Sequence, residues 1–327
     1  MAPTPSTAPM LSEDLTRHVL NLVDRSGIAE MLSEWYPSRR PGLESRSMVA
    51  IWLLLACEGK AVVQMEAVRL LRDRLTSDTA ELLRVSEELR AHPHESVRRA
   101  DERLHRALQE GGAAMDAEQR ATRMTRFAGR LLREQYRQRR ETHPATPLNV
   151  AIDTHFRRGA SGGQFFASNG RSPQRGWEYN VVITTPVDEP PAVVAMSQVP
   201  AGVLPSRDIP TLLDDLLGDG VVLSSVAADR AYLEGAVPDY LERCGATLIS
   251  DAREPAEQRR PPVVGHQSYT HARRNVERYL GALRSVEARA ADGRRAVGHG
   301  TATMFTVFGA NHRVAADVAR RSVGPTG

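Results

Sequence analysis

The sequence predicts a mixed α/β protein, with an all-helical N-terminal domain (residues 1–145) followed by a sheet-forming domain (residues 146–327). Three observations support this. Apolar residues recur at helical spacing as far as residue 140, and the segment ETHPATPLN (141–149) then interrupts the pattern with proline and threonine. After it, runs rich in β-branched residues alternate with helical segments, which is typical of a sheet crossed by helices.

Helical signals can be placed along the first domain. Ser12 is in position to cap a first helix, which Gly27 would end. The apolar run MVAIWLLLAC (48–57) is too short to span a bilayer and predicts a buried helix. Helical spacing predicts further helices over residues 62–75, 95–108 (with Ser96 as its cap) and 117–140.

The second domain alternates strands and helices. Strands are expected at residues 149–153, 177–185, 192–198, 221–229 and 246–250, with helices at 207–220 and 233–245. The first three strands are joined by short turns and predict an antiparallel meander. The later strands are joined through helices, and such crossovers predict parallel neighbours. The expected sheet is therefore mixed, a three-strand meander plus parallel strands with crossover helices.

Composition indicates a soluble protein. The 327 residues, 41% hydrophobic and 25% charged, are enough for two domains with ordinary cores. The first residues lack the basic and apolar regions of a signal peptide, and the two cysteines lack zinc-ligand spacing. We therefore expect a cytoplasmic protein with no membrane segment. A pI near 9.1 favours an anionic partner such as nucleic acid, although the heavy use of arginine in a GC-rich genome would also produce it.

Arginine is concentrated in the segment 117–140, which carries eight arginines beside Glu118 and Glu134. Either this is a solvated face whose arginines pair with those glutamates, or the clustered cationic side chains bind DNA phosphates. Four of them are taken as candidate DNA-binding residues: Arg126, Arg130, Arg133 and Arg137. The segment 95–108 also resembles a recognition helix after a turn.

Two strand-like runs end on aspartates, NVAID at Asp153 and VVLSSVAAD at Asp229. Aspartate often begins a turn after a strand, which explains either residue taken alone. If the two strands are neighbours, however, both carboxylates emerge at the same edge and repel each other unless a cation lies between them. Carboxylate oxygens suit Mg²⁺ or Mn²⁺, and two such ions about 3.5–4 Å apart support phosphodiester chemistry. The sequence thus predicts a magnesium site at Asp153 and Asp229.

These residues also carry a family resemblance. VAIDTHFRRG and AADRAYLEGAVPDYLERCGATLI resemble the first-Asp and second-Asp motifs of the DDE transposases of prokaryotic insertion sequences, over residues 148–252. The resemblance implies an RNase H-like catalytic domain that uses Mg²⁺ for phosphodiester hydrolysis and strand transfer at insertion-sequence ends. It implies that Asp153 and Asp229 are the first two metal ligands, and that Arg230 contacts backbone phosphate. The implied partners are double-stranded DNA, as transposon ends and target, and a second copy of the chain in a homodimer.

The third acid of such a site has two interpretations. Many of these transposases carry it on a helix as Tyr, two residues, Arg, three residues, Glu, six residues, Lys. This chain offers Tyr269, Arg273, Glu277 and Arg284, with one additional residue after the tyrosine and Arg in place of Lys. Glu277 is then the third catalytic acid. Alternatively, TATMFTVFGANHR (301–313) is a strand of an insertion that precedes the acid-bearing helix, and the chain is truncated before that helix.

Three functions therefore remain open. With a third acid, the chain is an active DNA transposase. Without one, it is a catalytically inactive remnant that only binds DNA. An RNase H-like, metal-dependent nuclease without strand transfer is the third. If the chain is truncated, Glu277 lies far from Asp153 and Asp229, and this is the arrangement that we expect.

Overall fold

A computed structural model gives the structure of the protein. It describes residues 9–37, 42–109, 117–142, 147–158, 164–168, 171–186, 190–200, 202–218, 220–232, 236–250 and 263–264, together with helical residues within 270–283 and 305–315. The chain divides into two compact units. One contains residues 1–115 and 285–313, and the other contains residues 116–284 and 314–327.

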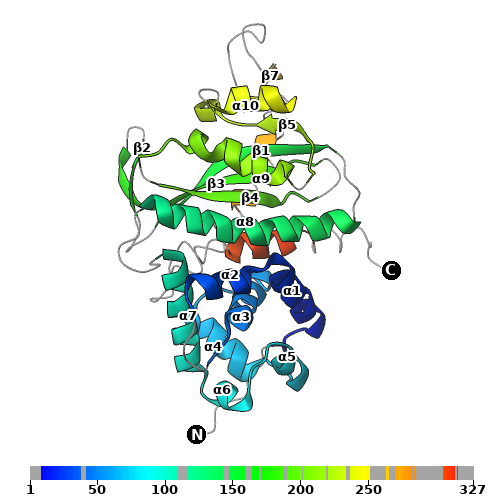
Figure 1. Ribbon diagram of the computed structural model, residues 1–327, viewed down its shortest axis with the longest axis vertical. Coiled ribbons are helices and arrows are strands. Elements are labelled where there is room, and N and C mark those ends of the chain that lie inside the picture. The colour runs from blue at the N-terminus through cyan, green and yellow to red at the C-terminus, as the bar shows by residue number, and fades with distance from the viewer. Residues whose placement is uncertain are drawn as a thin grey trace. The chain divides into compact units, whose positions relative to one another are not determined.

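The first unit is helical wherever the structure describes it. Its helices are α1 (Glu13–Ser26), α2 (Ile28–Trp35), α3 (Ser45–Cys57), α4 (Gln64–Asp73), α5 (Ser77–Leu82), α6 (Glu87–Ala91) and α7 (Pro93–Gln109) (Figure 1). Residues 305–313 form a further helix of the same unit. The predicted ends of α1 are confirmed. The Leu15 amide donates to Ser12 Oγ at 3.3 Å, and Gly27 ends the helix at φ 60°, a left-handed conformation. Residues 47–57 of α3 are all buried, which confirms the core helix.

Two predictions for this unit are wrong. Ser96 is not a cap, because α7 already begins at Pro93, a residue suited to the first turn of a helix. Residues 305–313 form a helix rather than a strand. Every residue from 305 to 311 is buried, so the segment has no polar face to reveal a helical period, and its β-branched residues favour a strand instead.

Helix 305–313 packs closely on α3. Phe305 and Phe308 are fully buried, and Arg313 donates a hydrogen bond to the carbonyl oxygen of Ala56. A Cβ on Gly309 would overlap that same carbonyl group. Glycine is therefore what allows the two helices to approach so closely.

The second unit contains one mixed sheet. Its strands are β1 (Leu148–Arg158), β2 (Gln164–Ser168), β3 (Arg171–Thr184), β4 (Val193–Val199), β5 (Leu223–Ala227), β6 (Thr247–Ile249) and β7 (Val263–Val264). Its helices are α8 (Ala117–Thr142), α9 (Ile209–Leu217) and α10 (Ala236–Cys244), with the 3-10 turns η1 (Pro205–Asp208) and η2 (Arg230–Tyr232). The described strands follow the order β2-β3-β1-β5-β6-β7, and β4 also pairs with β3.

The sheet combines antiparallel and parallel pairing, as the sequence predicts. Strand β3 pairs antiparallel with β1, β2 and β4, whereas β5 pairs parallel with β1 and β6. The chain passes through α9 between β4 and β5, and through α10 between β5 and β6. Strand β1 therefore lies inside the sheet, between an antiparallel and a parallel neighbour (Figure 1).

The hairpin of β1 and β3 is longer than predicted. Strand β3 begins at Arg171, and the unpredicted β2 continues the pairing of β1 along it, so that Arg158 and Gln164 both oppose Gly176. The division of the chain also differs from the expected boundary after residue 145. Helix α8 packs along β4 and belongs with the sheet, where the Gln198 amide donates to Thr125 Oγ1 at 3.3 Å.

The core of the sheet unit lies between the strands and the helices α9 and α10. Val150 and Ile152 of β1 pack there with side chains from β3, β4 and β5 and with Leu213 of α9 and Leu241 of α10. Burial of these apolar side chains holds β1 and β5 side by side. No helix in the described part of the chain is long and apolar enough to cross a bilayer.

Candidate functional site

The two predicted metal ligands belong to neighbouring parallel strands, but only Asp229 follows its strand. Asp229 comes two residues after the end of β5, whereas Asp153 lies inside β1 and pairs with Val181 of β3, so the prediction that a strand ends at Asp153 is wrong. Strands β1 and β5 are in a register that pairs Ala151 with Ala227. Side chains alternate along a strand with a period of two, so continuing this register by two residues leads to Asp153 and Asp229 on one face. The register thus directs both carboxylates to the level at which the pairing of β1 with β5 ends.

Backbone amides orient both carboxylates. The Thr154 amide donates to Asp153 Oδ1 at 2.8 Å, and the Ala231 amide donates to Asp229 Oδ1 at 2.9 Å. Both aspartates are partly buried. A carboxylate has roughly four acceptor positions, so an amide contact orients it without preventing it from binding a cation.

Negative charge accumulates around Tyr232, which follows Asp229 in η2. Burial raises the pKa of Tyr232, and the charges of Asp229, Asp153 and Glu178 raise it further. Glu178 is partly buried in β3, and this burial raises the pKa of its carboxyl. Sequence reasoning missed Glu178, although a charged residue at the start of the apolar run WEYNVVITT was a visible signal.

Glu277 points to solvent in the structure. Its helical segment buries Val276 and Leu280, whereas the Glu277 side chain is 61% exposed and its Oε1 accepts a hydrogen bond from Arg273 Nε at 3.0 Å. Within the described residues, no three His, Cys, Asp or Glu side chains are grouped so that they could hold a metal ion. Tyr269 and Arg284 of the expected motif lie outside the described residues. A third acid at Glu277 stays a prediction.

The aspartate pair fits a hard divalent cation in donor type. Mg²⁺ is commonly bound through one or two carboxylates, with water and substrate phosphate completing its coordination. Asp153 and Asp229 supply two such groups from neighbouring strands. The pair is therefore sufficient for one ion, whereas a second ion would need a further ligand.

The candidate DNA-binding arginines share one face of α8. We call Arg126, Arg130, Arg133 and Arg137 the α8 arginine stripe, because steps of four, three and four residues place them along one side of a helix. Arg126, Arg130 and Arg137 are exposed. Arg133 Nη1 lies 3.8 Å from Asp215 Oδ1.

The predicted pairing with Glu134 is present at Arg137, a member of the stripe. Arg137 Nη1 lies 3.5 Å from the buried carboxylate of Glu134. The side chains of Glu118 and Arg230 lie outside the described residues. The stripe is thus partly compensated by carboxylates, and it still presents exposed guanidinium groups.

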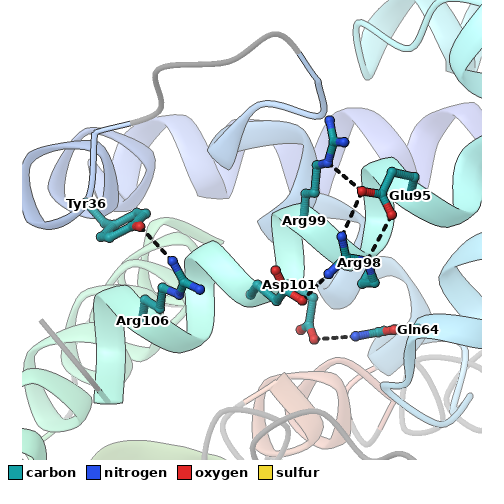
Figure 2. A network of polar contacts seen from close by, with 8 residues as sticks. Tyr36, Gln64, Glu95, Arg98, Arg99, Asp101 and Arg106 are labelled. Carbon is teal, nitrogen blue, oxygen red and sulfur yellow. Dashed lines mark hydrogen bonds and ion pairs between the residues drawn. The ribbon is translucent and has the colours of Figure 1, made fainter.

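Helix α7 differs from α8 in the balance of its charges (Figure 2). Glu95 accepts hydrogen bonds from Arg98 at 2.7 Å and from Arg99 at 2.6 Å. Arg98 also pairs with Glu102. These two arginines and two glutamates neutralise one another, so this group of side chains on α7 carries no net charge. A recognition helix at residues 95–108 stays a prediction.

The chain matches no known protein-family profile and no curated protein. Its function therefore has to be inferred from the residues that the fold brings together. These are a pair of carboxylates, one inside β1 and one just after the adjacent strand β5, and a long helix with an arginine stripe.

Proposed function

We propose that the chain is a DNA transposase of the DDE type, in which Asp153 and Asp229 bind Mg²⁺ or Mn²⁺. The observation that carries this proposal is the register of β1 and β5, which directs both carboxylates to the level at which the pairing of these parallel strands ends. The substrate is double-stranded DNA, with the α8 arginine stripe and Arg230 contacting backbone phosphates.

The sheet supports the RNase H-like part of the proposal. A meander of β1, β3 and β4, followed by parallel β5 and β6 through α9 and α10, is the order that the family resemblance implies. The hydrogen bond of 2.7 Å from Ser225 Oγ to Asn149 Oδ1 supports the register, because these residues face each other four positions before the aspartates.

The chain's own residues have separate tasks in this proposal. Asp153 and Asp229 hold the cation, and the amides of Thr154 and Ala231 keep their carboxylates oriented. Bound Mg²⁺ would lower the pKa of an attacking water or 3′-hydroxyl and stabilise the leaving oxygen. The stripe holds the DNA backbone through charge-assisted hydrogen bonds, which fix position rather than sequence.

A catalytically inactive DNA-binding protein is the second candidate. The exposed position of Glu277 and its ion pair with Arg273 favour it, because Asp153 and Asp229 then lack a third acid to share a second ion. An RNase H-like nuclease would use the same pair of aspartates and would differ only in failing to join the freed 3′ ends to target DNA.

Nicking of supercoiled plasmid in Mg²⁺ or Mn²⁺ tests the proposal. Asp153→Asn and Asp229→Asn should each abolish nicking while leaving circular dichroism and DNA affinity unchanged, because asparagine keeps the shape and removes the charge. Asp239→Asn changes an exposed carboxylate of α10 and is the matched control, with nicking expected at the wild-type rate. Wild-type nicking by Asp153→Asn would remove the pair from catalysis.

Mn²⁺ binding, measured by electron paramagnetic resonance, separates the candidates. Binding that both asparagine variants lose, without nicking, would identify the inactive DNA-binding protein. Nicking without end joining would identify the nuclease. A wild-type chain that neither binds Mn²⁺ nor nicks DNA would overturn the metal centre.

A further inference from the structure

The turn that follows β5 holds Asp229 at two atoms. The Ala231 amide donates to Asp229 Oδ1 at 2.9 Å, and the Tyr232 amide donates to the Asp229 carbonyl oxygen at 3.1 Å. The orientation of this carboxylate therefore depends on where η2 lies. Whatever anchors η2 also places Asp229.

Tyr232 connects η2 to the middle of the sheet. Its side chain is fully buried, and its hydroxyl donates to Asn180 Oδ1 at 3.1 Å. Asn180 is fully buried in β3, where it pairs with Thr154, the residue after Asp153. The hydroxyl thus links the turn that carries Asp229 to the strand beside β1.

The direction of this hydrogen-bond chain is fixed. Asn180 Nδ2 lies 2.8 Å from the carbonyl oxygen of Pro205, which can only accept. The amide group must therefore present Oδ1 to Tyr232, so the tyrosine must donate. Burial and the nearby carboxylates raise the pKa of Tyr232, so its hydroxyl keeps the proton that it donates.

We propose that Tyr232 is a positioning residue for Asp229: by anchoring η2 to Asn180, it holds the Asp229 carboxylate beside Asp153. The inference rests on the proposed function where it concerns metal binding. Its geometric part, the orientation of Asp229 by η2, does not. In metal sites, partners that orient a ligand typically change affinity by about 10- to 100-fold when they are removed.

Tyr232→Phe tests the inference, with Tyr240→Phe as its matched control. Tyr240 belongs to the same apolar core, and its hydroxyl donates a hydrogen bond of 2.7 Å to Asp214 on α9. Each variant removes one buried hydroxyl, so each should lower the melting temperature. Only Tyr232→Phe should weaken Mn²⁺ binding, by about tenfold at a temperature where both variants are folded.

A double-mutant cycle adds a readout that a purely structural role would not move. Asn180→Ala should weaken Mn²⁺ binding to the same extent as Tyr232→Phe. Combining the two changes should weaken it no further, because both remove the same hydrogen bond between Tyr232 and Asn180. The amide resonance of Ala231 should show slow hydrogen exchange in the wild type and in Tyr240→Phe, because this amide donates to Asp229. That protection should be lost in Tyr232→Phe.

The outcomes separate the inference from the proposed function. Suppose that Asp229→Asn abolishes Mn²⁺ binding, whereas Tyr232→Phe keeps the wild-type affinity and leaves the hydrogen exchange of the Ala231 amide unchanged. Tyr232 then has no positioning role, and the metal centre stands. If the wild type binds no Mn²⁺, the metal centre falls. The hydrogen exchange of the Ala231 amide then decides alone whether Tyr232 orients Asp229.

Discussion

Replacing Gly309 by alanine tests how closely helix 305–313 packs on α3. The new Cβ would overlap the carbonyl group of Ala56 and lie 2.7 Å from its Cβ, so the helices would have to separate. Overpacking costs about 1–3 kcal/mol or more, and a contact with backbone belongs at the upper end. Alanine regains about 1 kcal/mol through its helix propensity. The net loss of about 2 kcal/mol should lower the melting temperature of the helical unit by roughly 6–10 °C.

Scanning calorimetry of the full chain measures this change, and hydrogen exchange of the α3 amides assigns it to the helical unit, since the two units need not unfold together. Gly281→Ala is the matched control. It is also helical, its Cβ would meet nothing within 4 Å, and it should therefore stabilise the sheet unit by about 0.5–1 kcal/mol. Adding Ala56→Gly to Gly309→Ala should not restore stability, because the carbonyl group stays in place. Wild-type stability of Gly309→Ala, or full rescue by Ala56→Gly, would refute a close backbone contact.

Three further predictions concern charge. Asp101 of α7 (Figure 2) is buried, and burial raises the pKa of its carboxyl to about 6. The folded chain therefore keeps this proton to higher pH than the unfolded chain does. The stability that comes from binding this proton is lost as the pH rises through 6. Asp101→Asn should therefore raise the free energy of unfolding at pH 8 by about 3 kcal/mol, and this free energy should vary less with pH between about pH 4 and 6. Denaturant titrations measure this free energy, and an unchanged pH profile would contradict the prediction. Replacing the four arginines of the α8 arginine stripe by glutamine should reduce the slope of log K for DNA binding against log salt concentration by about 0.9 for each lost phosphate contact. The control, Arg98→Gln with Arg99→Gln, should change this slope little. Equal slopes for all variants would show that the stripe does not contact DNA. Glu277→Gln should leave nicking and Mn²⁺ affinity unchanged, because the carboxylate is exposed and paired with Arg273; loss of nicking by a folded variant would place Glu277 in the site.

The arrangement of the aspartates could be predicted because it depends on simple periodicities. Both residues end apolar runs of the sequence, and helical crossovers make parallel neighbours, so sequence order alone indicates that the two carboxylates lie on neighbouring strands. The apolar run does not reveal that β1 continues past Asp153 to Arg158, because those further residues pair only with β3. The mixed sheet and the caps of α1 follow from equally local signals. The identity of a third acid depends instead on where a helix packs, which no local pattern in the sequence determines.

Other features had no readable signal. Helix 305–313 is buried on every side, so it lacks the alternation that distinguishes a helix from a strand. The role of Asn180 depends on long-range pairing. It contacts Tyr232 and Pro205, which are distant in sequence, and only the folded sheet brings the three together.

The return of the chain to its helical unit at residues 305–313 has a consequence for folding during synthesis. Until these residues leave the ribosome, the surface of α3 around Ala56 and Cys57 lacks the helix that covers it. Translation of residues 116–304 takes roughly 10–40 s at about 5–20 residues per second, and the helices α1 to α7 lack this cover throughout that time. The first-made helices therefore acquire a closed core only when residues 305–313 have been made.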